Sequence, residues 1–118
     1  MSQHRKHRGY ETQRIVADYL RANGWPYAES AGAGRTGSDI TGTLGLDWEI
    51  KARRALNLTA LLQQLAARDE GLTGVGVVRV DGTGPATVHQ WPAVLPLASL
   101  VTLLRAAGYG DPTTPNST

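Results

Sequence analysis

The sequence lacks cysteine altogether, which excludes disulfide bonds, thiolate nucleophiles and cysteine-based zinc sites. It also lacks any apolar run of about 20 residues, the length that a membrane-spanning helix needs. The basic start MSQHRKHRGYE is followed by no apolar stretch that could form the core of a signal peptide. We therefore expect a cytoplasmic protein that has no membrane partner.

Charge is sparse and unevenly distributed along the chain. Only 19% of the 118 residues are Asp, Glu, Lys or Arg and 41% are hydrophobic, which describes one globular domain. The net charge is +2, yet residues 1–54 hold nine of the twelve Lys and Arg residues and six of the ten acids. This basic first half permits a polyanionic partner without requiring one, because net charge governs association rather than fold.

Hydrophobic spacing and turn residues predict alternating helices and strands. The predicted helices cover residues 10–23, 58–68 and 95–107. The predicted strands are a short segment that begins at Trp25, two segments within residues 38–52, and the segments 75–80 and 86–91. This order predicts an α/β fold with a central mixed β-sheet of about five strands flanked by helices. We expect residues 1–8 to form a basic flexible arm, 9–108 the folded domain and 109–118 a disordered tail.

The clearest pattern is a period of two in the second strand within residues 38–52. Even positions from Leu44 to Ala52 are apolar, whereas odd positions from Asp47 to Arg53 are charged. Successive side chains of a strand point to opposite faces of the sheet, so Glu49 and Lys51 should project from one face.

Asp39 lies on the preceding short strand, from which its carboxylate can approach that of Glu49. Two carboxylates, the backbone carbonyl of Ile50 and water would suit Mg²⁺ or Mn²⁺, which prefer oxygen ligands. Lys51 points the same way and could orient a water nucleophile or offset charge on a phosphate. The alternative is an ordinary solvent-facing strand with alternating charges.

Four short segments in order resemble the PD-(D/E)XK nuclease superfamily, most closely its Holliday-junction-resolvase-like members. They are a helix with an early acid at Glu11, then Ser30-Ala31-Gly32, Gly37-Ser38-Asp39-Ile40 and Trp48-Glu49-Ile50-Lys51. The resemblance covers about residues 8–80. Serine replaces the proline of the family's motif before the aspartate.

The resemblance implies a restriction-endonuclease-like core and a set of catalytic residues. Asp39 and Glu49 would bind the metal ion, Lys51 would assist attack, and Glu11 would support the site directly or through water. The likeness continues through Leu56-Asn57-Leu58 into the helix after the E-x-K strand, which in small phage relatives often carries a glutamine toward the site. Gln64 would be that residue, with the adjacent Gln63 as the alternative.

Basic and small residues outside this set are candidates for DNA contact. The segment 32–37 has the form G-x-G-x-x-G, but a strand rather than a helix follows it, which argues against a dinucleotide site. It is either a flexible loop or a loop that lets a nucleic-acid backbone approach. The basic start is either a phosphate-contacting arm or a solvated end. The candidate DNA-binding residues are Arg5, Lys6, Arg8, Ser30, Arg35, Arg53 and Arg54.

Together with these residues, the resemblance implies a Mg²⁺- or Mn²⁺-dependent, structure-selective DNA endonuclease, which we expect to be a Holliday junction resolvase of a phage or bacterium that cuts four-way junctions. The alternatives are a non-catalytic DNA-binding protein on a nuclease fold, or a nuclease for flaps, nicks or mismatches. The apolar segment WPAVLPLASLVTLL and the resemblance together predict a homodimer, because a four-way junction presents two symmetry-related strands.

Overall fold

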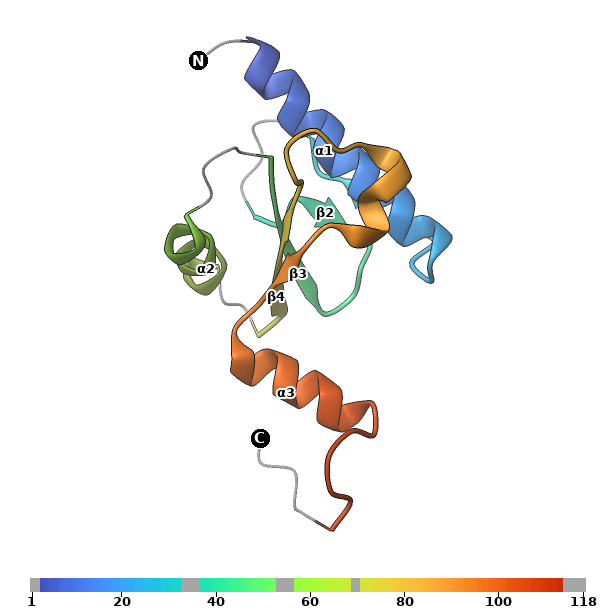
Figure 1. Ribbon diagram of the computed structural model, residues 1–118, viewed down its shortest axis with the longest axis vertical. Helices are drawn as coiled ribbons and strands as arrows, with labels where there is room; N and C mark the ends of the chain where they lie inside the picture. The colour runs from blue at the N-terminus through green and yellow to red at the C-terminus, as the bar shows by residue number, and fades with distance from the viewer. Residues whose placement is uncertain (1–2, 33–36, 53–56, 69–70, 114–118) are drawn as a thin grey trace.

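The computed structural model describes residues 3–32, 37–52, 57–68 and 71–113, with side chains from residue 9 onward (Figure 1). Its elements are α1 (Gln3–Ala22), β1 (Glu29–Ser30), β2 (Ile40–Thr41), β3 (Leu46–Lys51), α2 (Leu58–Ala67), β4 (Thr73–Val78), the 3₁₀ helix η1 (Pro85–Gln90), β5 (Ala93–Val94) and α3 (Leu97–Ala106). None of the helices in these ranges combines the length and the apolar character that crossing a bilayer requires.

The five strands form two sheets rather than the single sheet that the sequence predicts. The larger sheet is mixed: β3 runs parallel to β4 over the whole of both strands, and β5 pairs antiparallel with β4. The pair β1 and β2 forms a separate antiparallel sheet. The backbone N–H of Asp39 donates to the carbonyl of Trp48 over 2.9 Å and links this pair to β3. The predicted α/β class and mixed sheet are confirmed.

The core lies between α1 and one face of the larger sheet. Ile15, Val16 and Leu20 of α1 are buried there together with Trp48 and Ile50 of β3. Trp48 and Ile50 are even-numbered residues of the alternating segment, so its predicted period of two is confirmed on this face of the sheet. The helix α2 connects the parallel strands β3 and β4 and packs on the opposite face (Figure 1).

Local signals set the bounds of α2 well. Asn57 caps its first turn by accepting a hydrogen bond from the N–H of Ala60 over 3.0 Å. Leu61 and Leu65 are its buried residues.

The helix α1, by contrast, begins at Gln3 and is longer at its start than predicted. Residues 114–118 and the side chains of residues 1–8 lie outside the described part, so the predicted arm and tail stay predictions.

The predicted strand over residues 86–91 is wrong. The segment forms η1, and the strand that pairs with β4 is β5 instead. Pro85 stands in the first turn of η1, where its fixed φ and missing N–H favour a helical start and disfavour pairing in a sheet. A six-residue segment is too short for its hydrophobic pattern to decide between the two structures.

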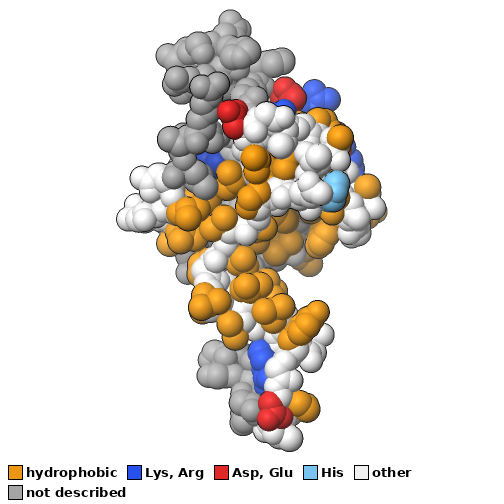
Figure 2. Space-filling model, viewed as in Figure 1, with side chains coloured by type: hydrophobic (Ala, Val, Ile, Leu, Met, Phe, Trp, Pro, Cys, Tyr) orange, Lys and Arg blue, Asp and Glu red, His pale blue; other side chains and the backbone are white. Residues whose placement is uncertain are grey.

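The predicted C-terminal helix is confirmed as α3, but it contributes nothing to the core. None of its residues is buried, and Leu97 remains 74% exposed. Figures 1 and 2 show α3 extending away from the sheets with apolar side chains along it. The apolar character of this segment therefore serves something other than the core of this chain.

Candidate functional site

The odd residues of β3 face α2 and are largely buried. The side chains of Asp47, Glu49 and Lys51 are only 6%, 10% and 15% exposed. Gly74 and Gly76 stand beside Asp47 and Glu49 in the parallel register and leave room for α2 to approach. The alternative of an ordinary solvent-facing strand is therefore wrong.

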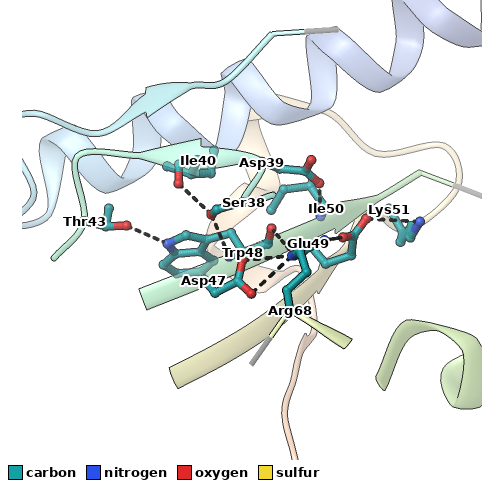
Figure 3. Close-up of polar contacts among 10 residues, drawn as sticks. All are labelled: Ser38, Asp39, Ile40, Thr43, Asp47, Trp48, Glu49, Ile50, Lys51 and Arg68. Carbon is teal, nitrogen blue, oxygen red and sulfur yellow. Dashed lines mark hydrogen bonds and ion pairs between the residues drawn. The ribbon is translucent and has the colours of Figure 1, made fainter. Parts of the chain in front are cut away.

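Asp39 is held against β3 by its own backbone and by its neighbour Ser38 (Figure 3). The Oδ2 atom of Asp39 accepts a hydrogen bond from the N–H of Ile50 over 2.7 Å. The Ser38 hydroxyl donates to the carbonyl of Ile40 over 2.7 Å and accepts from the N–H of Trp48 over 2.9 Å. Serine at this position thus ties the Asp39 segment to the strand that carries Glu49.

Burial raises the pKa of Asp39 to about 6, from a usual value of 3.8. The N–H of Ile50 opposes this rise, the negative charge of Glu49 adds to it, and Arg68 and Lys51 oppose it. The two carboxylates therefore repel one another across a partly desolvated space. A cation between them would relieve that repulsion, which is the electrostatic condition for a metal site.

Glu49 lies between two cationic side chains. Its Oε2 is 3.2 Å from Nζ of Lys51, and its Oε1 is 2.5 Å from Nη1 of Arg68. The carboxylate of Asp39 accepts a hydrogen bond from Ile50, the residue between Glu49 and Lys51 in β3. The predicted trio of Asp39, Glu49 and Lys51 is thus brought together.

Arg68 and Asp47 belong to this cluster, although the sequence did not mark them as site residues. Arg68 caps the end of α2, and its Nη2 and Nε atoms lie 3.0 and 3.3 Å from the two carboxylate oxygens of Asp47. A signal for Asp47 was present, because it shares the odd face of the strand with Glu49. Arg68 could be found only by knowing that α2 covers that face.

The carbonyl of Ile50 is directed toward the edge of β3 on which Asp39 lies. The carbonyl of Trp48 accepts from the N–H of Asp39 at that edge, and the carbonyl of Lys51 accepts from Arg79 at the other. Alternate carbonyls along a strand point to the same edge, so Ile50 follows Trp48. The third predicted metal ligand is therefore on the correct side.

The donor set fits a hard divalent cation. Within the described ranges, no group of three or more His, Cys, Asp or Glu side chains could hold a metal ion, so a site here would have only two side-chain ligands. With the two carboxylates, the Ile50 carbonyl and water would complete an all-oxygen set that suits Mg²⁺ or Mn²⁺. An ion bound through Oε2 of Glu49 would lie beside the Lys51 ammonium, and repulsion between the two cations would favour movement of Lys51 away from that oxygen.

Gln63 and Gln64 both line a pocket beside the cluster. Its volume is about 350 Å³, and Lys51, Asn57 and Leu61 are among its other walls. Both glutamine side chains are exposed. The structure thus places the predicted Gln64 next to Lys51 without separating its role from that of Gln63.

Glu11 lies in a different set of contacts. Its described partner is Arg79, with 3.6 Å between Oε1 and Nη1. Arg79 also donates to the Thr12 hydroxyl over 3.1 Å and stacks 5.5 Å above the ring of Trp91. No contact among the described residues joins Glu11 to Asp39 or Glu49, so its support of the site stays a prediction.

Most of the predicted DNA-binding residues fall on parts of the chain that are not described. Ser30 is the exception: it is partly exposed and pairs with Ile40 in the register of β1 and β2. The others are the side chains of Arg5, Lys6 and Arg8 and the whole of Arg35, Arg53 and Arg54.

No protein-family model, curated protein or solved structure matches the chain. The function of the chain must therefore be inferred from its own residues.

Proposed function

We propose that this chain is a metal-dependent, structure-selective DNA endonuclease with a restriction-endonuclease-like core, acting in the cytoplasm of a bacterial or phage-infected cell. The observation that carries the proposal is the meeting of Asp39, Glu49 and Lys51 beside Ile50, with the pKa of Asp39 raised by burial. Four-way DNA junctions are the proposed substrate, because the motif order resembles that of junction resolvases.

Each residue has a distinct task in hydrolysis of a phosphodiester. Asp39 and Glu49 would hold a Mg²⁺ or Mn²⁺ ion, which supplies Lewis acidity and lowers the pKa of a bound water. Lys51, once separated from Oε2 of Glu49, places a positive charge where negative charge develops on the phosphate. The hydrogen bond from the N–H of Ile50 fixes Asp39, so its orientation does not depend on the ion.

A second candidate function is DNA binding without catalysis. The burial of Asp39 counts against it, because burying a carboxylate costs folding free energy and a protein that only binds phosphates gains nothing from two acids. A third candidate keeps the chemistry but takes flaps, nicks or mismatches as substrate.

Cleavage of end-labelled DNA tests the proposal. The full chain is incubated with a four-way junction, a flap, a nicked duplex and a linear duplex, each with Mg²⁺ and with EDTA. We expect Mg²⁺-dependent cuts in the junction that leave 5′-phosphate and 3′-hydroxyl ends. Junction binding without cutting, in either Mg²⁺ or Mn²⁺, would favour the non-catalytic alternative.

Single variants assign the residues. Asp39→Ala, Glu49→Ala and Lys51→Ala should each lower cleavage by at least about a hundredfold, while junction affinity measured by gel shift is retained. Asp18→Ala is the matched control, since this acid forms an exposed ion pair with Arg21 on α1. Cleavage retained by any of the three variants would remove that residue from the mechanism.

A further inference from the structure

Four side chains on the α2 face of β3 form a row of alternating charge, here called the β3 charge row: Asp47, Arg68, Glu49 and Lys51 (Figure 3). The proposed function uses only the last two. The ion pair of Asp47 and Arg68 joins a carboxylate side chain that is 6% exposed to a guanidinium side chain that is 23% exposed, so desolvation offsets part of the attraction between them. Because Arg68 also contacts Glu49, the pair bears on the position of that second carboxylate.

Arg68 holds one oxygen of Glu49 in a fixed place. Its Nη1 is 2.5 Å from Oε1 of Glu49, while Nη2 and Nε bond the two oxygens of Asp47. Nη2 also donates to the carbonyl of Trp48 over 3.2 Å. A planar guanidinium bound at both ends of its fork cannot rotate away from Glu49 without breaking its bonds to Asp47.

Lys51 holds the other oxygen of Glu49 much less firmly. It reaches Oε2 by a single ammonium contact of 3.2 Å at the end of a four-carbon chain. Of the two cations on Glu49, Lys51 is therefore the one that can leave. Oε2 then becomes the oxygen that faces a ligand, and Oε1 stays on Arg68.

We propose that Arg68, anchored by Asp47, is a positioning residue of the metal site: it fixes Oε1 of Glu49 and so presents Oε2 to the divalent cation. Neither Arg68 nor Asp47 touches the ion. This inference rests on the proposed function for the assignment of Glu49 as a ligand. It adds two residues that set how strongly that ligand binds.

Calorimetric titration of the full, EDTA-treated chain with Mn²⁺ tests the inference. Arg68→Lys keeps the charge but loses the fork, and Asp47→Asn keeps the shape but loses the charge of the anchor. Each should raise the Kd for Mn²⁺ by about 10- to 100-fold, the usual effect of removing an outer partner of a metal ligand. Arg21→Lys is the matched control, because Arg21 also ends a helix and pairs with a carboxylate, and its Kd should stay unchanged.

Two further readouts separate positioning from a merely structural role. The double variant Asp47→Asn, Arg68→Lys should bind Mn²⁺ no more weakly than the worse single variant, because both changes act through one contact. In DNA cleavage, Arg68→Lys should need about 10- to 100-fold more Mn²⁺ for half-maximal rate yet approach the wild-type kcat at saturating Mn²⁺.

The outcomes distinguish this inference from the proposed function. Wild-type Kd values in both Arg68→Lys and Asp47→Asn, with a lowered unfolding temperature, would make the pair purely structural and overturn the inference alone. Weakened Mn²⁺ binding in a chain that cuts no DNA would support the inference and overturn the nuclease proposal. A wild-type chain that binds no Mn²⁺ would overturn both.

Discussion

The surroundings of Asp39 disfavour its ionised form and at the same time orient its carboxylate toward a site where a cation can bind. Burial beside Glu49 raises the pKa of Asp39 to about 6, so its ionised form is disfavoured in the metal-free protein. The hydrogen bond from Ile50 keeps the carboxylate oriented all the same. The free energy lost on ionisation is recovered when a cation arrives, which couples metal binding to stability.

The raised pKa of Asp39 predicts that the stability of the metal-free protein depends on pH. Because the folded pKa of Asp39 lies above 3.8, the folded protein binds this proton more tightly than the unfolded chain does. The contribution of the neutral carboxyl is fully present below about pH 4 and is lost as pH rises through 6. In EDTA, the free energy of unfolding of the wild type relative to Asp39→Asn should fall by on the order of 2 kcal/mol between pH 4 and 7.

Urea denaturation at a series of pH values measures this difference. Adding Mn²⁺ at pH 7 should stabilise the wild type but not Asp39→Asn. A wild-type minus variant difference that stays constant from pH 4 to 7 would show that Asp39 ionises in the folded protein as it does in water.

At the level of single residues, the sequence predicts those site residues that a pattern of neighbouring residues marks. The period of two marks Glu49 and Lys51 because it depends only on adjacent residues of one strand. Arg68 escapes prediction because its bonds to Asp47 and Glu49 span 21 and 19 residues. Its role depends on the packing of α2, which no local pattern encodes.

Among the elements, the closeness of α2 to β4 decides whether Arg68 reaches the β3 charge row. A Cβ atom on Gly76 would lie 2.8 Å from Cδ2 of Leu61, a side chain that is only 1% exposed. On Gly74 it would lie 3.3 Å from Cβ of Leu65. Glycine is therefore required more strictly at residue 76 than at 74.

Gly76→Ala should lower the free energy of unfolding by about 1–3 kcal/mol, because α2 must move away from an overpacked contact. Gly74→Ala should cost less. Gly9→Ala is the control: nothing lies within 4 Å of a Cβ there, and alanine inside a helix is favoured over glycine by roughly 0.5–1 kcal/mol. Urea denaturation checks all three, and equal stability of Gly76→Ala and wild type would show that α2 adjusts freely.

An element is predicted from sequence most precisely where two local signals agree, as they do in α2. The helix α2 has both a leucine stripe and the Asn57 cap. The segment that forms η1 has only a short mixed pattern, and there Pro85 and the pairing of β4 with β5 determine the outcome. The division of the strands into two sheets likewise depends on hydrogen bonds between distant segments.

For the whole molecule, α3 is the element whose sequence and environment disagree. Five of its large apolar side chains are exposed: Leu97, Leu100, Val101, Leu103 and Leu104. An apolar surface of this kind on a protruding helix is typical of an interface. We propose that a second copy of the chain covers it, which would give a two-fold arrangement suited to the paired strands of a four-way junction.

Light scattering coupled to gel filtration tests the dimer. The wild type should elute as a dimer at micromolar concentration, and Val101→Glu with Leu104→Glu as a monomer. Unfolding of the double variant should stay cooperative, because no α3 residue is buried within one chain. Leu44→Glu, at a fully exposed leucine outside α3, should leave the dimer intact. A monomeric wild type would contradict the proposal.

Anomalous diffraction from crystals of the full chain soaked in Mn²⁺ tests directly whether Asp39 and Glu49 bind a metal ion. We expect an anomalous peak between the carboxylates of Asp39 and Glu49, about 2.1 Å from an oxygen of each, with Oε1 of Glu49 still on Arg68 and Lys51 moved away from Oε2. Crystals without a peak there, in which Glu49 remains bound to both Arg68 and Lys51, would contradict the claim that these two acids form a metal site.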